Sequence, residues 1–219
     1  VLASDNPVWN GKVRVAKERV LNDPGRWKEP TMIFVNSMSD LFYEAFDEAI
    51  IFDLLDRMVK WDWHIFMVLT KREARMRDVI GAFCDSRGLE TLPKHIWMGV
   101  SVEDNKRAAR RIPPLVETRA ETRFVSMEPL LEPVDLSGFP VLDWYIVGGE
   151  SVELGENPKK ARPFDVSWAL SIAEYCKSVG AAFHFKQFGT NPVGVTLTAF
   201  KGDNPEEFPE SVLIREYPY

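Results

Sequence analysis

Residues 143–151 read DWYIVGGES, so four consecutive apolar or aromatic residues are followed at once by two glycines, a glutamate and a serine. A short run that is apolar at every position is typical of a strand buried on both faces of a parallel sheet. Similar runs, rich in β-branched and aromatic residues, recur along the chain. We predict parallel strands near residues 31–36, 64–70, 95–101, 123–127, 143–148 and 182–187.

Amphipathic patterns with a helical period lie between most of these runs. Ile51, Leu55 and Met58, for example, fall on one face of a helix. We predict helices over residues 47–60, 73–83, 104–112 and 165–179. Pro113 and Pro114 are expected to end the third helix, because proline cannot continue the helical hydrogen-bond ladder. Strands that alternate with helices predict an α/β fold with a parallel sheet.

The number of strands favours a partial TIM-like (βα) barrel, since six are too few for a closed barrel of eight. An open, doubly wound sheet is the alternative. We assign residues 1–189 to this single domain, with a crossover loop at 131–142. The apolar pattern decays after Gly189, so residues 190–219 are interpreted as a loosely structured tail packed on the domain, with one short strand at 212–214.

The composition is that of an ordinary globular protein. Of the 219 residues, 45% are hydrophobic and 27% charged, which argues against disorder. The 27 Lys and Arg residues against 33 Asp and Glu residues give a net charge of −6, which argues against nonspecific nucleic-acid binding. Only two cysteines occur, and no membrane span or signal peptide is visible, so we expect a cytoplasmic protein.

Polar residues gather where the predicted strands end, which is where parallel α/β folds bind ligands. The residues in question are Asn36, Ser37, Met38, Asp40, Lys71, Arg72, Ser101, Glu103, Ser126, Glu128, Gly148, Gly149, Glu150, Lys186 and Gln187. The opposite ends of the strands carry no comparable set. We therefore predict a ligand pocket at the carboxyl ends. Glu128 is the most informative member, because a carboxylate at a buried strand end needs a partner.

Each of these residues also has a simpler interpretation when taken alone. Asp40 can cap a helix, and Lys71 and Arg72 can belong to a solvated helix start. The three histidines share no metal-ligand spacing and are interpreted as structural. Cys84 and Cys176 lie too far apart in the sequence to form a zinc or iron–sulfur site, so no metal ligands are predicted.

Seven motifs occur in order along the chain. They are FVNSMSDLF (34–42), VLTKR (68–72), WMGVSVED (97–104), RFVSMEPLL (123–131), IVGGES (146–151), ARP (161–163) and FKQFG (185–189). Through them the sequence resembles, from about Gly11 to Gly189, the phage-type three-cysteine-motif family, which is found in phages, prophages and bacteria. That family is itself similar to radical S-adenosylmethionine enzymes. The resemblance thus implies a partial TIM-like barrel with S-adenosylmethionine and a [4Fe–4S] cluster as cofactors.

One departure from the family bears on the cluster. Family members carry a strand and a loop with three cysteines, followed by Tyr-Ala, upstream of the part matched here. Nothing of that kind occurs between Val1 and Trp27. Either the first strand and the cluster loop are missing from this sequence, as the lack of an initiator Met favours, or the protein has lost the cluster. With the strand restored, the barrel would have about seven strands.

The resemblance also implies roles for the strand-end residues. Asn36, Ser37, Met38 and Asp40 would bind the methionine amino group, Ser101 and Glu103 the ribose and carboxylate, and Gly148 and Gly149 would let the backbone approach the adenine. The catalytic candidates are Glu128, Glu150 and Lys71. The substrate-binding candidates are Arg72, Ser126, Arg162, Lys186 and Gln187. Lys71 and Arg72 can pair either with the cofactor's carboxylate or with an anionic substrate.

The function implied by the resemblance is the generation of a 5′-deoxyadenosyl radical that acts on an unknown substrate, when the N-terminal cluster segment is present. Two other classes stay open. One is a hydrolase or lyase that uses Glu128 and Glu150 as paired carboxylates. The other is a cluster-free protein that binds a nucleotide or a protein partner.

Overall fold

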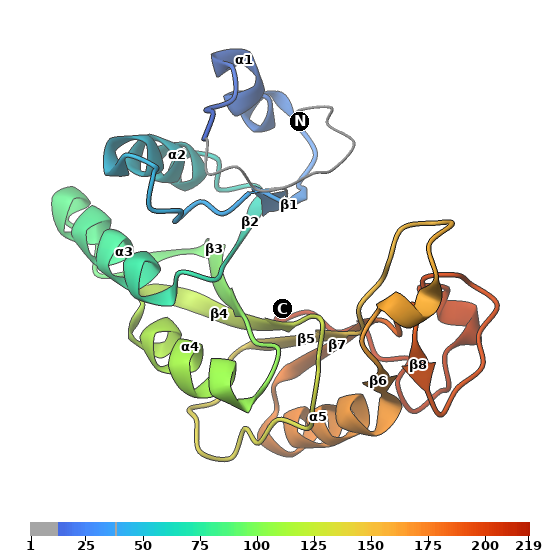
Figure 1. Cartoon of the computed structure of the whole chain (residues 1–219). Coiled ribbons are helices and arrows are strands. Elements are labelled where there is room, and N and C mark those ends of the chain that lie inside the picture. The colour runs from blue at the N-terminus through green and yellow to red at the C-terminus, as the bar shows by residue number, and fades with distance from the viewer. Residues whose placement is uncertain (1–12, 38) are drawn as a thin grey trace.

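Six parallel strands form the main sheet of the computed structural model, which describes residues 13–37 and 39–219. In spatial order they are β1 (Met32–Val35), β2 (Ile65–Thr70), β3 (Leu92–Ser101), β4 (Ala120–Met127), β5 (Trp144–Gly148) and β7 (Ala182–Gln187). Every pairing between neighbours is parallel. The sheet curves into a half-barrel (Figure 1), which confirms the predicted α/β fold and partial TIM-like barrel. The expectations for Met38 and for residues 1–12 lie outside the described residues.

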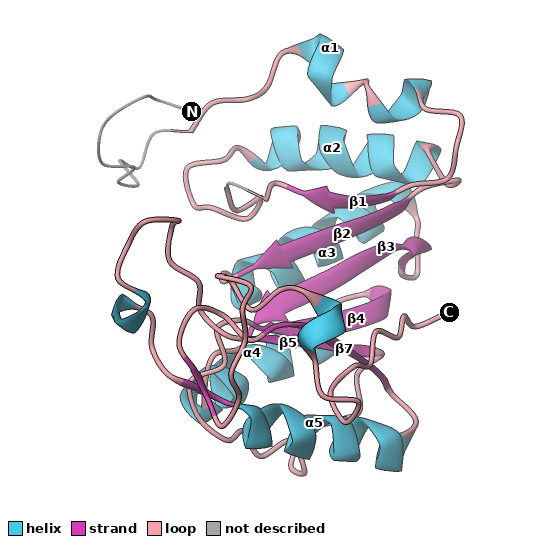
Figure 2. Ribbon diagram, turned by 90° about the vertical axis from the view of Figure 1, so that its right-hand side faces the viewer, coloured by secondary structure: helices cyan, strands magenta, loops and turns pink. Residues whose placement is uncertain are grey.

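Four long helices cover the convex face of the sheet (Figures 1 and 2). They are α2 (Glu48–Lys60), α3 (Glu73–Arg87), α4 (Asn105–Glu117) and α5 (Val166–Val179). Their apolar faces meet the outward-facing strand residues in one continuous core, which includes Ile51, Ile80 and Val68. The remaining helical segments are short: α1 (Glu18–Leu21) and the 3₁₀ turns η1 (Pro24–Arg26), η2 (Pro158–Lys160) and η3 (Pro205–Glu207).

Helix α4 continues through the two prolines that were expected to end it, so that expectation was wrong. The prolines deprive the carbonyls of Ala109 and Arg110 of their helical partners, but both of these residues are exposed, where water can replace the lost bonds. The buried side chains of Ile112 and Leu115 lie on either side of the prolines. Packing of this apolar face therefore outweighs the local helix-breaking tendency.

The concave face of the sheet carries its own cluster of large side chains: Met67, Trp97, Phe124, Trp144 and Ile146. The ring of Trp144 packs against Trp97 at a centroid distance of 5.6 Å and against Phe124 at 5.9 Å. Gly99 is required beneath this cluster, because a Cβ there would overlap the Phe124 ring. Since no strand of residues 13–37 and 39–219 lies opposite this face, aromatic rings fill the space that a closed barrel fills with residues from its far side.

The C-terminal segment, residues 190–219, packs over this aromatic cluster on the concave face. It runs antiparallel along β7, where the backbone N–H of Phe185 donates to Ile214 O at 2.8 Å and that of Glu216 donates to Phe183 O at 2.9 Å. Its last tyrosines, Tyr217 and Tyr219, pack on the aromatic cluster through Trp144 and Trp97, at centroid distances of 5.3 and 5.8 Å.

Residues 190–219 are more ordered than the sequence pattern suggested. The expected strand at 212–214 is replaced by a single backbone bridge between Arg215 and His184. Phe208 and Val212 are buried in the main core. A second sheet of two short strands joins β6 (Phe164–Asp165) to β8 (Pro192–Val193). Through Phe208 and Val212 the segment contributes to the domain's core, whereas Val193 and Leu213 remain exposed.

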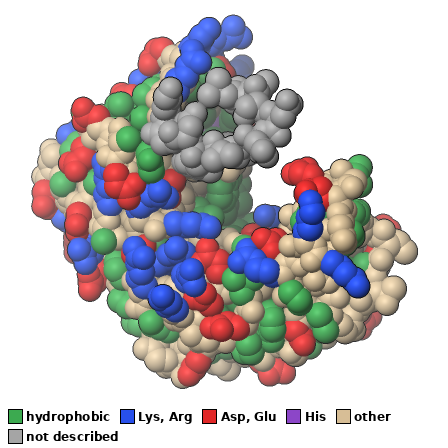
Figure 3. Space-filling view, viewed as in Figure 1, with side chains coloured by type: hydrophobic (Ala, Val, Ile, Leu, Met, Phe, Trp, Pro, Cys, Tyr) green, Lys and Arg blue, Asp and Glu red, His purple; other side chains and the backbone are tan. Residues whose placement is uncertain are grey.

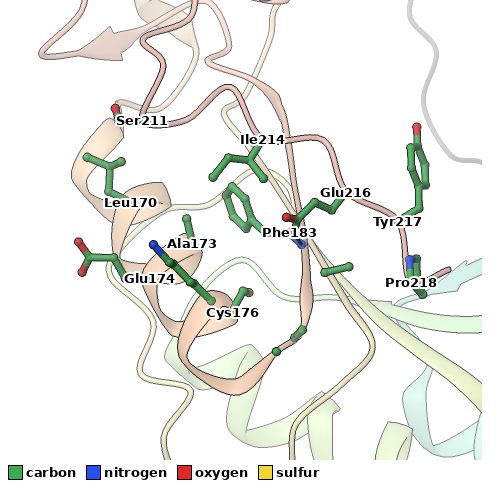
Figure 4. A pocket seen from close by; sticks show the side chains of 14 residues that line it. Leu170, Ala173, Glu174, Cys176, Phe183, Ser211, Ile214, Glu216, Tyr217 and Pro218 are labelled. Atoms are coloured by element: carbon green, nitrogen blue, oxygen red, sulfur yellow. Dashed lines mark hydrogen bonds between the residues drawn. The ribbon is translucent and has the colours of Figure 1, made fainter.

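A cavity of about 730 Å³ lies outside the barrel, between α5 and the C-terminal segment (Figure 4). Leu170, Phe183 and Ile214 form part of its wall. It adjoins the start of β7 rather than the strand ends, so it is separate from the region where polar residues converge. Within residues 13–37 and 39–219, no helix has the length and apolarity needed to cross a membrane.

Substitution of Gly149 should destabilise the fold, because a Cβ at this position would overlap the carbonyl oxygen of Phe188. We expect Gly149→Ala to cost about 1–3 kcal/mol or more of unfolding free energy, measured by urea denaturation. Gly138→Ala is the control, since no atom lies within 4 Å of a Cβ there. Equal stabilities for the two variants would contradict this account of the β5 end.

Candidate functional site

Two adjoining cavities lie at the carboxyl ends of the strands. Figure 3 shows this side of the molecule hollowed, with apolar side chains inside and both acidic and basic side chains at the rim. The larger cavity, of about 710 Å³, extends over the ends of β4, β5 and β7, and the smaller, of about 380 Å³, lies at the ends of β1, β2 and β3. Phe34, Ser37 and Leu69 line both cavities, so the two meet along this wall.

Asp40 organises the smaller cavity. Its carboxylate is buried and accepts four hydrogen bonds: from Phe42 N at 2.9 Å, Thr70 Oγ1 at 2.7 Å, Lys71 N at 3.0 Å and an Arg72 guanidinium nitrogen at 3.0 Å. These bonds tie the loop after β1 to the end of β2. Because its acceptor capacity is used within the protein, Asp40 positions Lys71 and Arg72.

A chain of charges continues behind Lys71. The Lys71 ammonium lies 3.0 Å from the buried carboxylate of Glu103, which also accepts a bond from Arg111 at 2.8 Å. Glu73, which is also buried, is paired with Arg110 at 2.6 Å. Buried carboxylates of this kind are tolerable only when cations and N–H donors compensate them. Glu103 thus holds Lys71 in place and does not itself line either cavity.

Ser101 is the one buried side chain of the smaller cavity with unused capacity. The residue is only 4% exposed and lines the cavity. Its hydroxyl has no hydrogen-bond partner among the described residues, and protein atoms do not enclose it fully. The hydroxyl therefore opens into the cavity, where it can donate to or accept from a ligand. Asn36, at the end of β1, has a left-handed backbone with φ of 58°, which Asn tolerates better than most residues.

Glu128 is the central group of the larger cavity. Its Oε2 accepts bonds from the Lys186 ammonium at 3.2 Å and from Ser126 Oγ at 3.4 Å. Its Oε1 accepts none among the described residues and is not fully enclosed, so it faces the cavity. Burial raises the pKa of Glu128 above its usual value, and Lys186 and Ser126 partly oppose that shift. The Glu128–Pro129 peptide bond is cis.

The two glycines after β5 are explained by contacts within the protein. A Cβ on Gly148 would lie 2.5 Å from Glu128 Oε1, so this glycine leaves room for the carboxylate. Gly149 leaves room for the backbone of Phe188, and its N–H donates to Gln187 O at 3.0 Å. Of the two, only Gly149 also lines the larger cavity.

Glu150 lines the larger cavity but is firmly bound to Arg162. The Arg162 guanidinium donates to both carboxylate oxygens, at 2.8 and 2.7 Å, and the backbone N–H adds a third bond at 2.8 Å. These bonds from Arg162 hold the pKa of Glu150 below its usual value. Gln187 is likewise occupied, since its amide donates to Gly149 O and Ser151 Oγ at 3.1 and 3.0 Å.

The structure divides the sequence candidates between the two cavities. The smaller one is lined by Asn36, Ser37, Asp40, Lys71, Arg72 and Ser101. The larger one is lined by Ser37, Ser126, Glu128, Gly149, Glu150, Lys186 and Gln187. Glu103, Gly148 and Arg162 do not line either cavity and instead contact residues that do.

Sequence reasoning missed several lining residues, of which Phe34 and His184 are the most informative. His184 precedes Lys186 by two residues on β7, and this spacing places both on the same face of the strand. The alternation along β7 was thus a usable signal. His184 Nδ1 is buried and has no partner among the described residues. Burial, with Arg215 and Lys186 nearby, lowers the pKa of His184 to about 4.

The residues that the structure describes do not form a metal centre. No group of three or more His, Cys, Asp or Glu side chains in the described part of the chain is arranged to hold a metal ion. Cys84, on α3, and Cys176, on α5, are both buried. Burial raises the pKa of each thiol, that of Cys176 to about 12, so neither is poised to become a thiolate ligand.

The family model that matches this chain is DUF5131, described as "Protein of unknown function", over residues 3–206. The chain belongs to the DUF5131 family. A comparison with curated proteins finds no match. Among solved structures, the chain is similar to one entitled "Structure of EAL Enzyme Bd1971 - cAMP and cyclic-di-GMP bound form", with a TM-score of 0.38 and 10% identity. That similarity covers 68% of this chain but 44% of the other, and it is too weak to say anything about function.

Removal of the Asp40 carboxylate should strongly destabilise this DUF5131 protein. Asp40→Ala leaves a buried threonine hydroxyl, two backbone N–H groups and a guanidinium without their acceptor, at a cost of about 3–5 kcal/mol in urea unfolding. Asp53→Ala is the matched control, since Asp53 is 54% exposed and its pair with Arg57 should contribute about 0–1 kcal/mol. A loss no larger than that of the control would contradict the organising role of Asp40.

His184 should make stability fall with acid. Its pKa is about 4 in the folded protein against 6.5 for the ordinary group, so the unfolded chain binds more protons between these values. Folding therefore loses stability as pH falls from 6.5 to about 4. We expect His184→Asn to lose less stability than the wild type over this interval in urea titrations, whereas parallel pH profiles would contradict the shift.

Proposed function

We propose that this domain binds S-adenosylmethionine at the adjoining cavities and acts on a substrate held beside Glu128, as an enzyme of the radical S-adenosylmethionine type. One observation carries the proposal. Four residues that the resemblance assigns to the cofactor, Asn36, Ser37, Asp40 and Ser101, line the smaller cavity together with Lys71 and Arg72, while Glu128 and Lys186 line the larger one together with Gly149. The shared wall would bring cofactor and substrate next to each other.

The smaller cavity offers suitable partners for the polar end of such a cofactor. Ser101 presents a free hydroxyl, and Lys71 and Arg72 present N–H donors beside it. A carboxylate is well matched to Lys and Arg donors. Asp40 is engaged by four internal donors, so we now propose that it positions Lys71 and Arg72 instead of binding the methionine amino group.

The apolar part of the larger cavity's wall suits the binding of a substrate beside Glu128. Phe34, Met67 and Leu69 line it on one side, and Gly149 on another. Largely apolar walls with a few placed polar groups are typical of small-molecule sites. In this arrangement the apolar side chains would pack against the substrate while Glu128 and Lys186 orient it.

The described residues do not fit a [4Fe–4S] cluster, which needs cysteine thiolates at one loop. Both cysteines are buried on helices instead. Radical chemistry is thus proposed on the resemblance alone, and no step of it is derived from this chain. Positioning of cofactor and substrate is the part that this chain's own residues would perform.

The decisive measurement is binding of S-adenosylmethionine to the purified chain by isothermal titration calorimetry. Ser101→Ala, which removes a hydroxyl that the fold does not use, should weaken binding by a factor of roughly ten. Glu128→Gln should leave binding unchanged. No detectable binding would refute the cofactor assignment, as would equal affinity of the wild type and Ser101→Ala.

The radical part is tested separately with protein expressed from the complete gene and reconstituted anaerobically with iron and sulfide. We expect formation of 5′-deoxyadenosine, with Glu128→Gln sparing this cleavage but impairing substrate turnover. No 5′-deoxyadenosine above background would refute the radical assignment.

A hydrolase or lyase is the second candidate. Its supporting observation is that Glu128 and Glu150 line one cavity with pKa values shifted in opposite directions, the pattern of an acid and base pair. Activity without iron and S-adenosylmethionine, lost in both Glu128→Gln and Glu150→Gln, would favour this candidate.

A further inference from the structure

The larger cavity contains an oppositely charged pair with unused bonding capacity. Glu128 and Lys186 are 3.2 Å apart. The pair uses Glu128 Oε2 and one N–H of Lys186. Among the described residues, this leaves Glu128 Oε1 as a free acceptor and two lysine N–H groups as free donors. The Lys186 side chain is 56% exposed, so its ammonium can turn toward a ligand without losing burial.

Part of the wall of the same cavity is apolar. Met67 and Leu69 of β2 and Trp144 and Ile146 of β5 line it, on the concave face of the sheet. The cavity therefore offers an apolar surface together with one negative and one positive group. The other carboxylate in its lining, Glu150, is compensated by Arg162 and contributes no free charge.

We propose that the substrate cavity recognises a free α-amino acid with an apolar or aromatic side chain. Its ammonium group would donate to Glu128 Oε1, its carboxylate would accept from the Lys186 ammonium, and its side chain would lie on Met67, Leu69 and Ile146. This identification rests on the proposed function for the role of the larger cavity, and it names the class of substrate.

Charge complementarity selects a zwitterion over other ligands. A ligand with a single charge would desolvate both Glu128 and Lys186 while compensating only one of them. A zwitterion compensates both at once. The charges of Glu128, the ligand ammonium, the ligand carboxylate and Lys186 would then alternate in sign around a square, and the ion pair between Glu128 and Lys186 need not break. The 3.2 Å spacing of the protein groups is similar to the separation of the two charged groups within one α-amino acid. Such electrostatic matching gives specificity.

The test combines ligand analogues with variants, in calorimetric titrations without S-adenosylmethionine. L-Phenylalanine is the probe, N-acetyl-L-phenylalanine lacks the ammonium group, and L-phenylalaninamide lacks the carboxylate. For the wild type we expect each modification to weaken binding roughly tenfold or more, the loss of one charge-assisted contact.

Each variant should abolish one of these penalties. Glu128→Gln should bind L-phenylalanine more weakly than the wild type does, and it should bind N-acetyl-L-phenylalanine no more weakly than L-phenylalanine. Lys186→Gln should also bind L-phenylalanine more weakly, and it should bind L-phenylalaninamide no more weakly than L-phenylalanine. Lys177→Gln, which makes the same charge change at an exposed site on α5, should behave like the wild type. Thermal unfolding of each variant confirms that it is folded.

The outcomes separate this inference from the proposed function. If S-adenosylmethionine binds but L-phenylalanine, L-leucine and L-tryptophan do not, the substrate class is wrong while the cofactor assignment stands. If L-phenylalanine and its analogues bind as expected and S-adenosylmethionine fails to bind, the cofactor assignment is wrong while the substrate class stands. Equal penalties in wild type and variants would overturn the roles of Glu128 and Lys186.

Discussion

The concave face of the sheet has to be covered. Its strands carry large apolar side chains on this side, and a half-barrel supplies no opposing strands to bury them. Toward the amino ends of the strands, the rings of Trp97, Phe124 and Trp144 pack on one another, and Tyr217 and Tyr219 close over them. Toward the carboxyl ends the face stays open, and that is where both cavities lie. The concave side is thus filled by aromatic rings near the amino ends of the strands and hollow near their carboxyl ends.

The polar residues at the hollow end follow a second constraint, the cost of burying charge. Asp40, Glu73 and Glu103 are all buried, and each is compensated by arginine, lysine or N–H donors. Their partners are fixed as a result, and Lys71 and Arg72 face the smaller cavity with donors to spare. Much of the strand-end polarity therefore serves to hold a few groups in place, and those few are the ones that can contact a ligand.

The groups with unused capacity are more informative than the charged groups as a whole. Ser101 Oγ and Glu128 Oε1 have no partners within the described part of the chain and open into the cavities, whereas Glu150 and Gln187 are engaged elsewhere. This distinction separates residues that shape the cavities from residues that can bind within them. It also places the free groups on both sides of a shared wall at Phe34, Ser37 and Leu69. Ligands held in the two cavities would therefore lie against the same wall.

The sequence by itself determined the strands, the parallel sheet and the end of the sheet where the polar residues converge, and it favoured a partial barrel over an open, doubly wound sheet. It could do so because buried parallel strands are apolar at every position, and because parallel strands bring all their carboxyl ends to one edge. Only the tertiary structure decided that α4 runs through Pro113 and Pro114, that Phe208 and Val212 are buried in the core, and which strand-end residues are free. Those outcomes depend on contacts between segments far apart in the chain: Asp40 with Arg72, Glu150 with Arg162, and Tyr217 with Trp144. A local pattern carries no information about such partners, because hydrogen bonds and ring contacts are satisfied in space and not along the sequence.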